Sequence, residues 1–583
     1  NIDEWADRIS ALLASENTQP GEPSMFSIDQ ITLINSKFSI SDSRKDSIKD
    51  GFDYNHFQLL DLNADLLNLK TVRDTFQIDV KQLRTRDSVS GLSIDNLETF
   101  FRNSRHGLTF FDLDLQMGKT HIKDFVELKR DKPSQMASFI DSVAIRADFD
   151  NTIIHTNELS YFVPELKKYD QAVDISGLFQ GTVNRFYSDN FAIAFGNDSR
   201  FKGSIDIEGL PNINQTIFSL NLRESTLKAT DLRQYMGQQT FRISNKFGLI
   251  KMSGNFDGLL NNFVADGIFD TRMGHIESNI KIEIEDNELP QYSGELFLKN
   301  FELGRFTEVS NFQRVDLDGS LAGKGFTLET ANFQLDALIP KVGINGYNYT
   351  NIETDGTFAE SFFNGQVDVN DPMFKLFATG SVDLRDNNKI FKLRGRLDTA
   401  LLKEVKLTEE DMELSTSFDL DISGLKLDSI QGKIDLTETF YRYESQSIDL
   451  DSVYFGASRG ATGRKLTVSS DLFYADFNGD FEFSEISREL SNISEQYRLQ
   501  FSSRSDEVAQ FIRRNPRTSN NFNMNYQFEL YDITPLIHIF DSTIYVSKNT
   551  NIDGRFTNEN NESIVLNTKI DTVQFGKINF YDN

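Results

Sequence analysis

The sequence contains no cysteine and very little proline, and both absences narrow what the chain can be. Without cysteine among its 583 residues it has no disulfide, no thiolate metal site and no thiol nucleophile. Only 10 prolines occur, and no Pro-rich, Ser-rich or low-complexity tract separates compact domains. A chain of this length ordinarily forms roughly three or four domains. The sequence instead indicates quasi-one-dimensional growth, in which each structural unit contacts only its neighbours.

Positive charge is also scarce. The chain has 60 basic and 88 acidic residues, which gives a net charge of -28. Such a balance repels phosphate backbones, so we expect no nucleic-acid partner. No apolar run approaches the ~20 residues that span a bilayer. The chain begins with Asn1 instead of methionine, and we expect it to be an internal piece of a longer protein.

Motifs of catalysis and cofactor binding are missing as well. No glycine-rich phosphate loop and no Gly-x-Ser-x-Gly motif occurs. Carboxylate pairs such as Asp112/Asp114 and Asp419/Asp421 could bind calcium or act as acid and base. Their i, i+2 spacing, however, is what the polar side of any alternating strand produces. The six histidines are scattered without ligand spacing: His56, His106, His121, His155, His275 and His538. We therefore predict no enzyme activity, no metal and no cofactor.

A short pattern does recur along most of the chain: an apolar residue, a polar residue and then glycine. Examples are Met252-Ser253-Gly254, Phe363-Asn364-Gly365 and Phe477-Asn478-Gly479. Residues two apart share one side of a strand, so these glycines belong to the apolar side. Glycine inside a strand marks a bend, a bulge or a close approach of another backbone. The pattern predicts a long sheet that curves around a space other molecules can enter.

The expected fold is all-β with a few short helices: an elongated, twisted, U-shaped antiparallel sheet enclosing an apolar groove. Residues 1–14 have helical spacing and would cap one end of the sheet, since the acidic polar side disfavours the alternative of a membrane-surface helix. Residues 15–170 contain little glycine and form a first β region, and 171–583 form the main curved body. Helical inserts are expected at 484–499 and 505–514.

An apolar strand side that is not covered by a second protein layer must find another partner. Acyl chains suit it, because each buried CH2 contributes about 0.8 kcal/mol without any directional contact. We expect phospholipid acyl chains in the groove. The predicted groove-lining residues are Ile205, Ile207, Ile280, Ile282, Ile284, Val367, Val369, Phe418, Leu420, Ile422, Phe473, Phe477, Phe481, Phe483, Phe528, Leu530, Gly365 and Gly479.

One segment resembles a known family. Residues 319–384, with Gly346-Tyr347-Asn348-Tyr349-Thr350-Asn351 at their core, followed by Phe363 to Pro372 and preceded by Gly294 to Gly304, resemble the periplasmic region of TamB-family proteins of the Bacteroidetes type. The stretches 26–41 and 57–101 are similar to the related AsmA-like portion.

The resemblance implies a protein that spans the periplasm as a long lipid-lined sheet and supports outer-membrane biogenesis. It implies an inner-membrane anchor helix and an outer-membrane barrel of the BamA/TamA type as partner. Both the anchor and the domain that engages the barrel are expected outside this chain.

The leading hypothesis is therefore a phospholipid conduit across the periplasm. A second hypothesis is a chaperone or scaffold that holds outer-membrane strands by adding them to a sheet edge. A third, a β-helix enzyme acting on carbohydrate, requires regular coil repeats and a carboxylate cluster, and the sequence displays neither.

Overall fold

The protein was analysed as a computed structural model. It describes residues 25–581 apart from 43–45, 48–51, 54, 133–134, 136–137, 162–169, 211, 286–287, 328, 360, 386–388, 462, 485, 487–490, 492–521 and 558–562. The expected helices at 1–14 and 505–514, and most of the insert at 484–499, lie outside the described residues.

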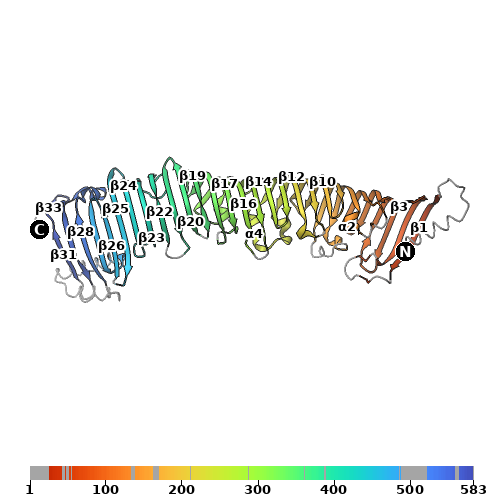
Figure 1. Ribbon diagram of the computed structural model, residues 1–583, viewed down its shortest axis with the longest axis horizontal. Coiled ribbons are helices and arrows are strands. Elements are labelled where there is room, and N and C mark those ends of the chain that lie inside the picture. Colours follow the sequence, from red (N-terminus) through yellow and green to blue (C-terminus); the bar gives the residue numbers. More distant parts are fainter. Residues whose placement is uncertain are drawn as a thin grey trace. The chain divides into compact units, whose positions relative to one another are not determined.

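Strands form because apolar and polar residues alternate. In β22 (Ile390–Leu401), Phe391 and Leu393 are half-buried, whereas the intervening Lys392 and Arg394 are exposed. An alternation with a period of two gives an apolar side only in an extended backbone. The same pattern recurs in most strands of the chain. Figure 1 shows these strands as a long succession of arrows.

The chain divides into two units, Asn1–Glu288 and Leu289–Asn583. The strands of unit 1 are β1 (Met25–Ser41), β2 (His56–Val72), β3 (Thr75–Asp87), β4 (Ser93–Ile94), β5 (Asn96–Ser104), β6 (Gly107–Met117), β7 (Thr120–Lys129), β8 (Ala144–His155), β9 (Ala172–Gly181), β10 (Arg185–Phe195), β11 (Ser199–Glu208), β12 (Ile217–Lys228), β13 (Leu249–Leu259), β14 (Asn262–Thr271) and β15 (Gly274–Glu283). The change of glycine content expected near residue 170 falls inside unit 1, and a domain boundary there stays a prediction.

The strands of unit 2 are β16 (Gln291–Glu302), β17 (Phe312–Lys324), β18 (Asn332–Ile344), β19 (Tyr347–Ala359), β20 (Phe362–Asp371), β21 (Phe374–Asp383), β22, β23 (Met412–Ser423), β24 (Gln431–Tyr443), β25 (Gln446–Gly460), β26 (Gly463–Ser470), β27 (Phe473–Asp480), β28 (Asn523–Leu530), β29 (Ile544–Val546), β30 (Thr550–Thr557), β31 (Ser563–Lys569), β32 (Thr572–Phe575) and β33 (Ile578–Tyr581). β29, β32 and β33 form a small separate sheet.

The described helices are short and lie in connections between strands. They are α2 (Phe139–Ser142), α3 (Thr156–Leu159), α4 (Gln238–Lys246), α5 (Leu303–Thr307), α8 (Thr534–Phe540) and the 3-10 turns η3 (Ile213–Gln215) and η4 (Ala229–Tyr235). Within the part of the chain that the structure describes, no helix is long and apolar enough to cross a bilayer.

The other 30 strands belong to one antiparallel sheet. Strands of each unit pair in sequence order, apart from the two-residue β4, which lies beside the pair β3–β5. Among the described residues, β1 pairs only with β2 and β31 only with β30, so the sheet is open. At ~4.8 Å per strand, the fifteen sheet strands of unit 2 extend over about 67 Å, and those of unit 1 over about 62 Å because β4 and β5 both pair with β3. The expected all-β class with a long antiparallel sheet is confirmed.

β-Bulges bend the strands at corresponding places. Glu224 in β12 and Asn300 in β16 have positive φ angles of 47° and 51°, and the pairing register shifts at both. Each bulged backbone N–H donates to a side chain of the next strand: Glu224 N to Ser253 Oγ at 3.1 Å, and Asn300 N to Asp316 Oδ1 at 2.6 Å. A bulge increases local twist and bend. The side-chain acceptors satisfy the amides that the bulge removes from the ladder.

The recurring glycines are required by close approach between strands. Gly365 pairs directly with Gly356 of β19 and Gly380 of β21. A Cβ atom at Gly365 would lie 2.3 Å from the carbonyl oxygen of Asp355 and 2.4 Å from Cα of Gly356. These are backbone atoms of the neighbouring strand, so a side chain there forces strands apart.

We predict that Gly365→Ala lowers the free energy of unfolding by about 1–3 kcal/mol, because the added methyl overlaps the β19 backbone. Gly460→Ala is the matched control, since a Cβ at Gly460 meets nothing within 4 Å. Urea unfolding followed by circular dichroism measures both. An equal midpoint for the two variants would contradict the close-approach explanation.

Candidate functional site: an apolar sheet face

The apolar side of unit 2 is continuous from strand to strand. Cross-strand neighbours share a sheet side, so a chain of paired residues traces a row across the sheet. One such row contains only apolar residues and glycine: Gly294, Leu321, Leu335, Gly356, Gly365, Gly380, Leu393, Leu420, Ile434, Phe455, Val468, Ala475, Phe528 and Ile552. We call the side of the sheet that carries this row the apolar face of unit 2.

A second row runs beside the first on the same side of the sheet, two residues away from it on every strand. It contains Tyr292, Gly323, Phe333, Phe358, Phe363, Val382, Phe391, Ile422, Gly432, Ala457, Leu466, Phe477, Tyr526 and Gly554. Rings touch along it: Phe333 stacks on Phe358 with centroids 5.4 Å apart, and Phe358 lies 4.9 Å from Phe363. Most members of this second row are half-buried. The strip formed by the two rows therefore remains accessible to a small ligand.

The opposite side of unit 2 is polar and carries ion pairs between neighbouring strands. Arg394 Nη2 lies 2.6 Å from Asp419 Oδ2 on the next strand, and Lys392 Nζ lies 3.5 Å from Asp421 Oδ1. These side chains are largely exposed, so each pair contributes only about 0–1 kcal/mol. Their effect is to mark this side as the one that faces water.

Unit 1 repeats the arrangement. One row contains Phe76, Asn103, Leu108, Leu128, Ile145, Gly181, Phe186, Ile207, Phe218, Gly258, Phe263 and Ile282. At the line of bulges, Phe191, Leu222 and Met252 are 3%, 4% and 7% exposed and are packed by half-buried residues from both sides. These residues form the floor where the strands bend.

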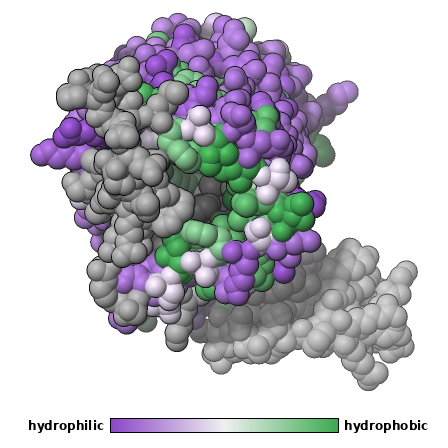
Figure 2. All heavy atoms as spheres, turned by 90° about the vertical axis from the view of Figure 1, so that its right-hand side faces the viewer, coloured by the Kyte–Doolittle hydropathy of each residue, from purple (hydrophilic) through white to green (hydrophobic). Residues whose placement is uncertain are grey.

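The concavity of unit 1 is visible from its β1 end. Figure 2 shows a hollow there whose rim is formed by hydrophobic residues, while the outer surface is hydrophilic. The apolar face of unit 1 therefore lines a hollow, and its polar face forms the outside.

The apolar face of unit 2 becomes fully covered near β27–β30. Phe481, Phe522 and Phe556 are 3%, 2% and 2% exposed, with Met524 beside them. The ring of Phe522 lies 4.6 Å from that of Phe556 and 6.4 Å from that of Phe481. Phe556 is the cross-strand partner of Met524, so this cluster belongs to the same side of the sheet and is buried more deeply than most members of the rows over β16–β26.

A buried arginine fixes this covered end. Arg464 of β26 is 5% exposed, lies 2.8 Å from Glu482 Oε2, and also donates to backbone carbonyls of Leu427 and Asp428. The Asp428 carboxylate accepts the backbone N–H groups of Phe483 and Ser484 at 2.5 and 3.2 Å. Burial alone would raise the pKa of Asp428, but these hydrogen bonds and Arg464 lower it on balance. The contacts tie the β23–β24 loop to the chain that follows β27.

The predicted groove residues fall on these rows in two sets, one in each unit. In unit 1, Ile207 and Ile282 share one row, Ile205 and Ile280 share its neighbour, and Ile284 follows the end of β15 and is 42% exposed.

In unit 2 the predicted residues lie in several rows and pairs. Gly365, Leu420 and Phe528 belong to the first row and Ile422 and Phe477 to the second. The remaining positions are Val367 and Phe418 in a third row, Val369 in a buried row, Phe473 paired with Leu530, Gly479 paired with Met524, and Phe481 and Phe483 beyond the end of β27.

Several residues of the apolar face were not among the predicted ones. Phe333, Phe358, Phe363 and Phe391 occupy one row and are as half-buried as the predicted residues beside them. The same alternation that selected Phe418 and Leu420 carries the signal for them. No sequence signal predicted the ring contact between Phe481 and Phe522.

A histidine on the polar side of unit 1 is held between two carboxylates. His275 Nδ1 lies 2.7 Å from Asp270 Oδ1, and Nε2 lies 3.1 Å from Glu277 Oε1. The hydrogen bond to Asp270, followed by that to Glu277, raises the pKa of His275 above its usual 6.5. Among the described residues no three His, Asp or Glu groups are arranged to hold a metal ion.

Comparison with known proteins identifies no relative. No family model matches the chain, and no curated protein or solved structure is detectably similar to it. The resemblance to the TamB family thus rests on the quoted segments alone.

We predict a pH-dependent stability of unit 1 from His275. A histidine whose pKa is raised by folding stabilises fully below its unfolded pKa of about 6.5, and this contribution is lost as pH rises through the higher folded value. His275→Gln should remove that decline above about pH 6.5, measured as the midpoint of urea unfolding at each pH. His106→Gln is the control, because His106 has no ion pair among the described residues. Identical pH profiles for the native chain and His275→Gln would contradict the assignment.

Proposed function

We propose that the protein is a non-enzymatic lipid-binding protein whose apolar faces hold phospholipid acyl chains. The observation that carries this proposal is the pair of continuous apolar rows over β16–β26, most of whose members are half-buried. An uncovered strip of this size requires a partner, because apolar surface exposed to water costs about 25 cal/mol per Å².

The chemistry of the strip favours flexible chains over other ligands. The rows carry no charged residue and few hydrogen-bond donors, so they offer neither orientation nor specificity to a polar substrate. A saturated chain gains about 0.8 kcal/mol for every CH2 it buries. Since one apolar residue follows another on successive strands, a bound chain can shift from one position to the next without a large barrier.

We extend the proposal to transport. Each unit offers about 60–70 Å of sheet across its successive strands, which exceeds the length of one lipid. Such a face supports passage of lipids in single file, with headgroups left in water. In keeping with the sequence resemblance, we propose a periplasmic phospholipid conduit that supports outer-membrane biogenesis, together with a BamA/TamA-type barrel.

One observation favours a second function, a scaffold for outer-membrane strands. β31 pairs only with β30 among the described residues, and its Ile564, Val565 and Leu566 are 39%, 49% and 60% exposed. A free strand edge offers backbone groups that can pair with an added strand. Crosslinks from β31 to barrel polypeptides would support the scaffold, and crosslinks from the apolar rows to acyl chains would support the conduit.

We predict that Val367→Lys reduces lipid bound to the purified protein by about tenfold, because an ammonium group on the apolar face is poorly solvated beside a hydrocarbon chain. Gln366→Lys is the matched control: it adds the same charge to the neighbouring residue, whose side chain belongs to the exposed polar side. Native mass spectrometry counts the lipids, and circular dichroism checks the fold. Ile282→Lys tests unit 1 independently. Equal lipid content in Val367→Lys and Gln366→Lys would contradict the proposal.

A further inference from the structure

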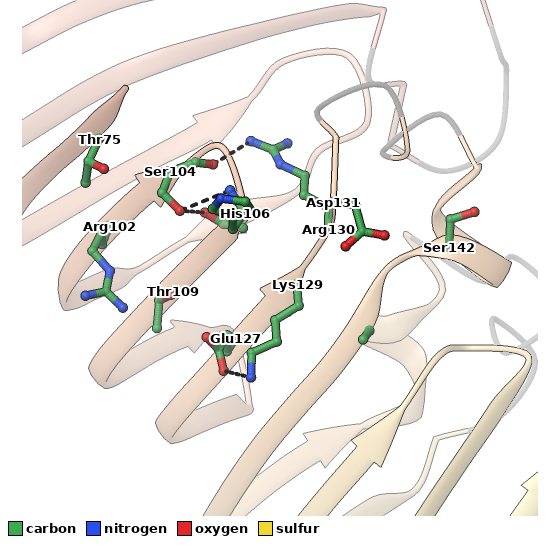
Figure 3. A pocket seen from close by; sticks show the side chains of 12 residues that line it. Thr75, Arg102, Ser104, His106, Thr109, Glu127, Lys129, Arg130, Asp131 and Ser142 are labelled. Carbon is green, nitrogen blue, oxygen red and sulfur yellow. Dashed lines mark hydrogen bonds and ion pairs between the residues drawn. The ribbon is translucent and has the colours of Figure 1, made fainter. Parts of the chain in front are cut away.

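A cavity of about 600 Å³ lies beside the turn between β5 and β6 of unit 1, and most of its lining is polar. Lys129 Nζ lies 3.3 Å from Glu127 Oε2, and Arg130 Nη2 donates to Asn103 Oδ1 at 3.0 Å. Figure 3 shows the guanidinium groups of Arg102 and Arg130 pointing apart. These charged groups do not converge on one ligand, so the cavity carries no assignment.

The apolar face of unit 2 is more informative, because the size of its side chains changes along the sheet. The third row runs beside the first, on the side away from the second row, and is two residues from the first on every strand. It contains Leu296, Gly319, Ala337, Thr354, Val367, Ala378, Gly395, Phe418, Leu436 and Val453.

On β20 and β21 the first and third rows carry little side chain. The four positions are Gly365, Val367, Ala378 and Gly380. The three heavy atoms nearest to an added Cβ are backbone atoms at both glycines. Gly356 on β19 differs, because an added Cβ there would lie 2.7 Å from Cε2 of the Phe363 ring. The first and third rows therefore leave the most room above the sheet at β20 and β21.

From β23 to β25 the same two rows carry only branched and aromatic side chains. The six positions are Phe418, Leu420, Ile434, Leu436, Val453 and Phe455. Phe418 also reaches over the preceding strand, because a Cβ atom added at Gly395 of β22 would lie 2.8 Å from Cζ of its ring. The ring thus fills the space that the glycine leaves, and the room above the sheet decreases at β23.

This difference in room affects acyl chains according to their shape. A straight chain needs the width of one methylene group, whereas a methyl-branched chain needs additional width at every branch. Forcing extra methyl groups against packed side chains is unfavourable, because rings and branched groups must leave their preferred rotamers. One additional carbon in an apolar site changes binding by about tenfold or more.

We propose that β23–β25 is a narrow segment of the apolar face and that Phe418 is its specificity-determining residue. The segment accepts straight acyl chains and excludes methyl-branched chains, which bind at β20 and β21. Phe418 has this role because its ring extends over two strands, β22 and β23. The inference rests on the proposed function, since it requires that acyl chains occupy the apolar face.

The test uses two phosphatidylethanolamine probes with a diazirine near the chain end, one with straight chains and one with methyl-branched chains. The full chain is loaded with each probe and irradiated, and the labelled peptides are quantified. In the native chain, the ratio of branched to straight labelling should be about tenfold lower at β23–β25 than at β20–β21. In Phe418→Ala the two ratios should agree within about twofold.

Two further variants separate the role of Phe418 from a general loss or gain of aromatic surface. Phe333→Ala is the matched control, because it removes a half-buried ring from the second row, on β18, and should leave both ratios unchanged. Ala378→Phe adds a ring to the third row on β21 and should lower the ratio there about tenfold. It removes no existing side chain, and circular dichroism checks the fold of each variant.

Equal ratios at β20–β21 and β23–β25 of the native chain would overturn the narrow segment. So would a low ratio at β23–β25 that persists in folded Phe418→Ala, or an unchanged ratio at β21 in folded Ala378→Phe. These outcomes leave lipid binding intact, because the straight probe still labels the apolar face. Absence of labelling by both probes would overturn the proposed lipid binding, and the specificity of Phe418 with it.

Discussion

The structure depends on one constraint: nearly every strand has an apolar side, and the described part of the chain provides no second layer to cover it. A sheet in this situation must bend over its own apolar side or leave it exposed. The floor of unit 1, where Phe191 and Leu222 are buried by neighbours from both sides, shows the bending. At the end of unit 2, Phe522 and Phe556 lie in a buried aromatic cluster instead. Over β16–β26 most members of the two apolar rows are only half-buried.

The apolar-polar-glycine pattern now has a physical explanation in two parts. In Met252-Ser253-Gly254 the serine hydroxyl accepts the backbone N–H of the bulged Glu224, and the glycine lies where strands approach too closely for a Cβ atom. The bulge and the glycine act at one place on adjacent strands, and both bend the sheet. Glycine therefore shapes the wall of the concavity more than it adds space inside it.

Alternation made the strands and the apolar side predictable, since a period of two has only one structural meaning over so many residues. Ile422 and Phe477 were assigned to one side from their own strands, and the register places them in one row. What the alternation cannot give is contact between distant segments. The ring contact between Phe481 and Phe522 depends on the register between β27 and β28. Bulge positions such as Glu224 could not be predicted from the sequence either, because nothing in the residue type indicates that this glutamate adopts a positive φ angle.

The most direct measurement is photo-crosslinking with a phospholipid that carries a diazirine near the end of its acyl chain, followed by peptide mapping. Bound lipid should label alternate residues of β19–β23, such as Phe363, Leu393 and Leu420, and leave Asn364 and Arg394 unlabelled. Labelling that ignores this alternation, or that is confined to strand edges such as β31, would contradict the claim that the apolar face holds acyl chains.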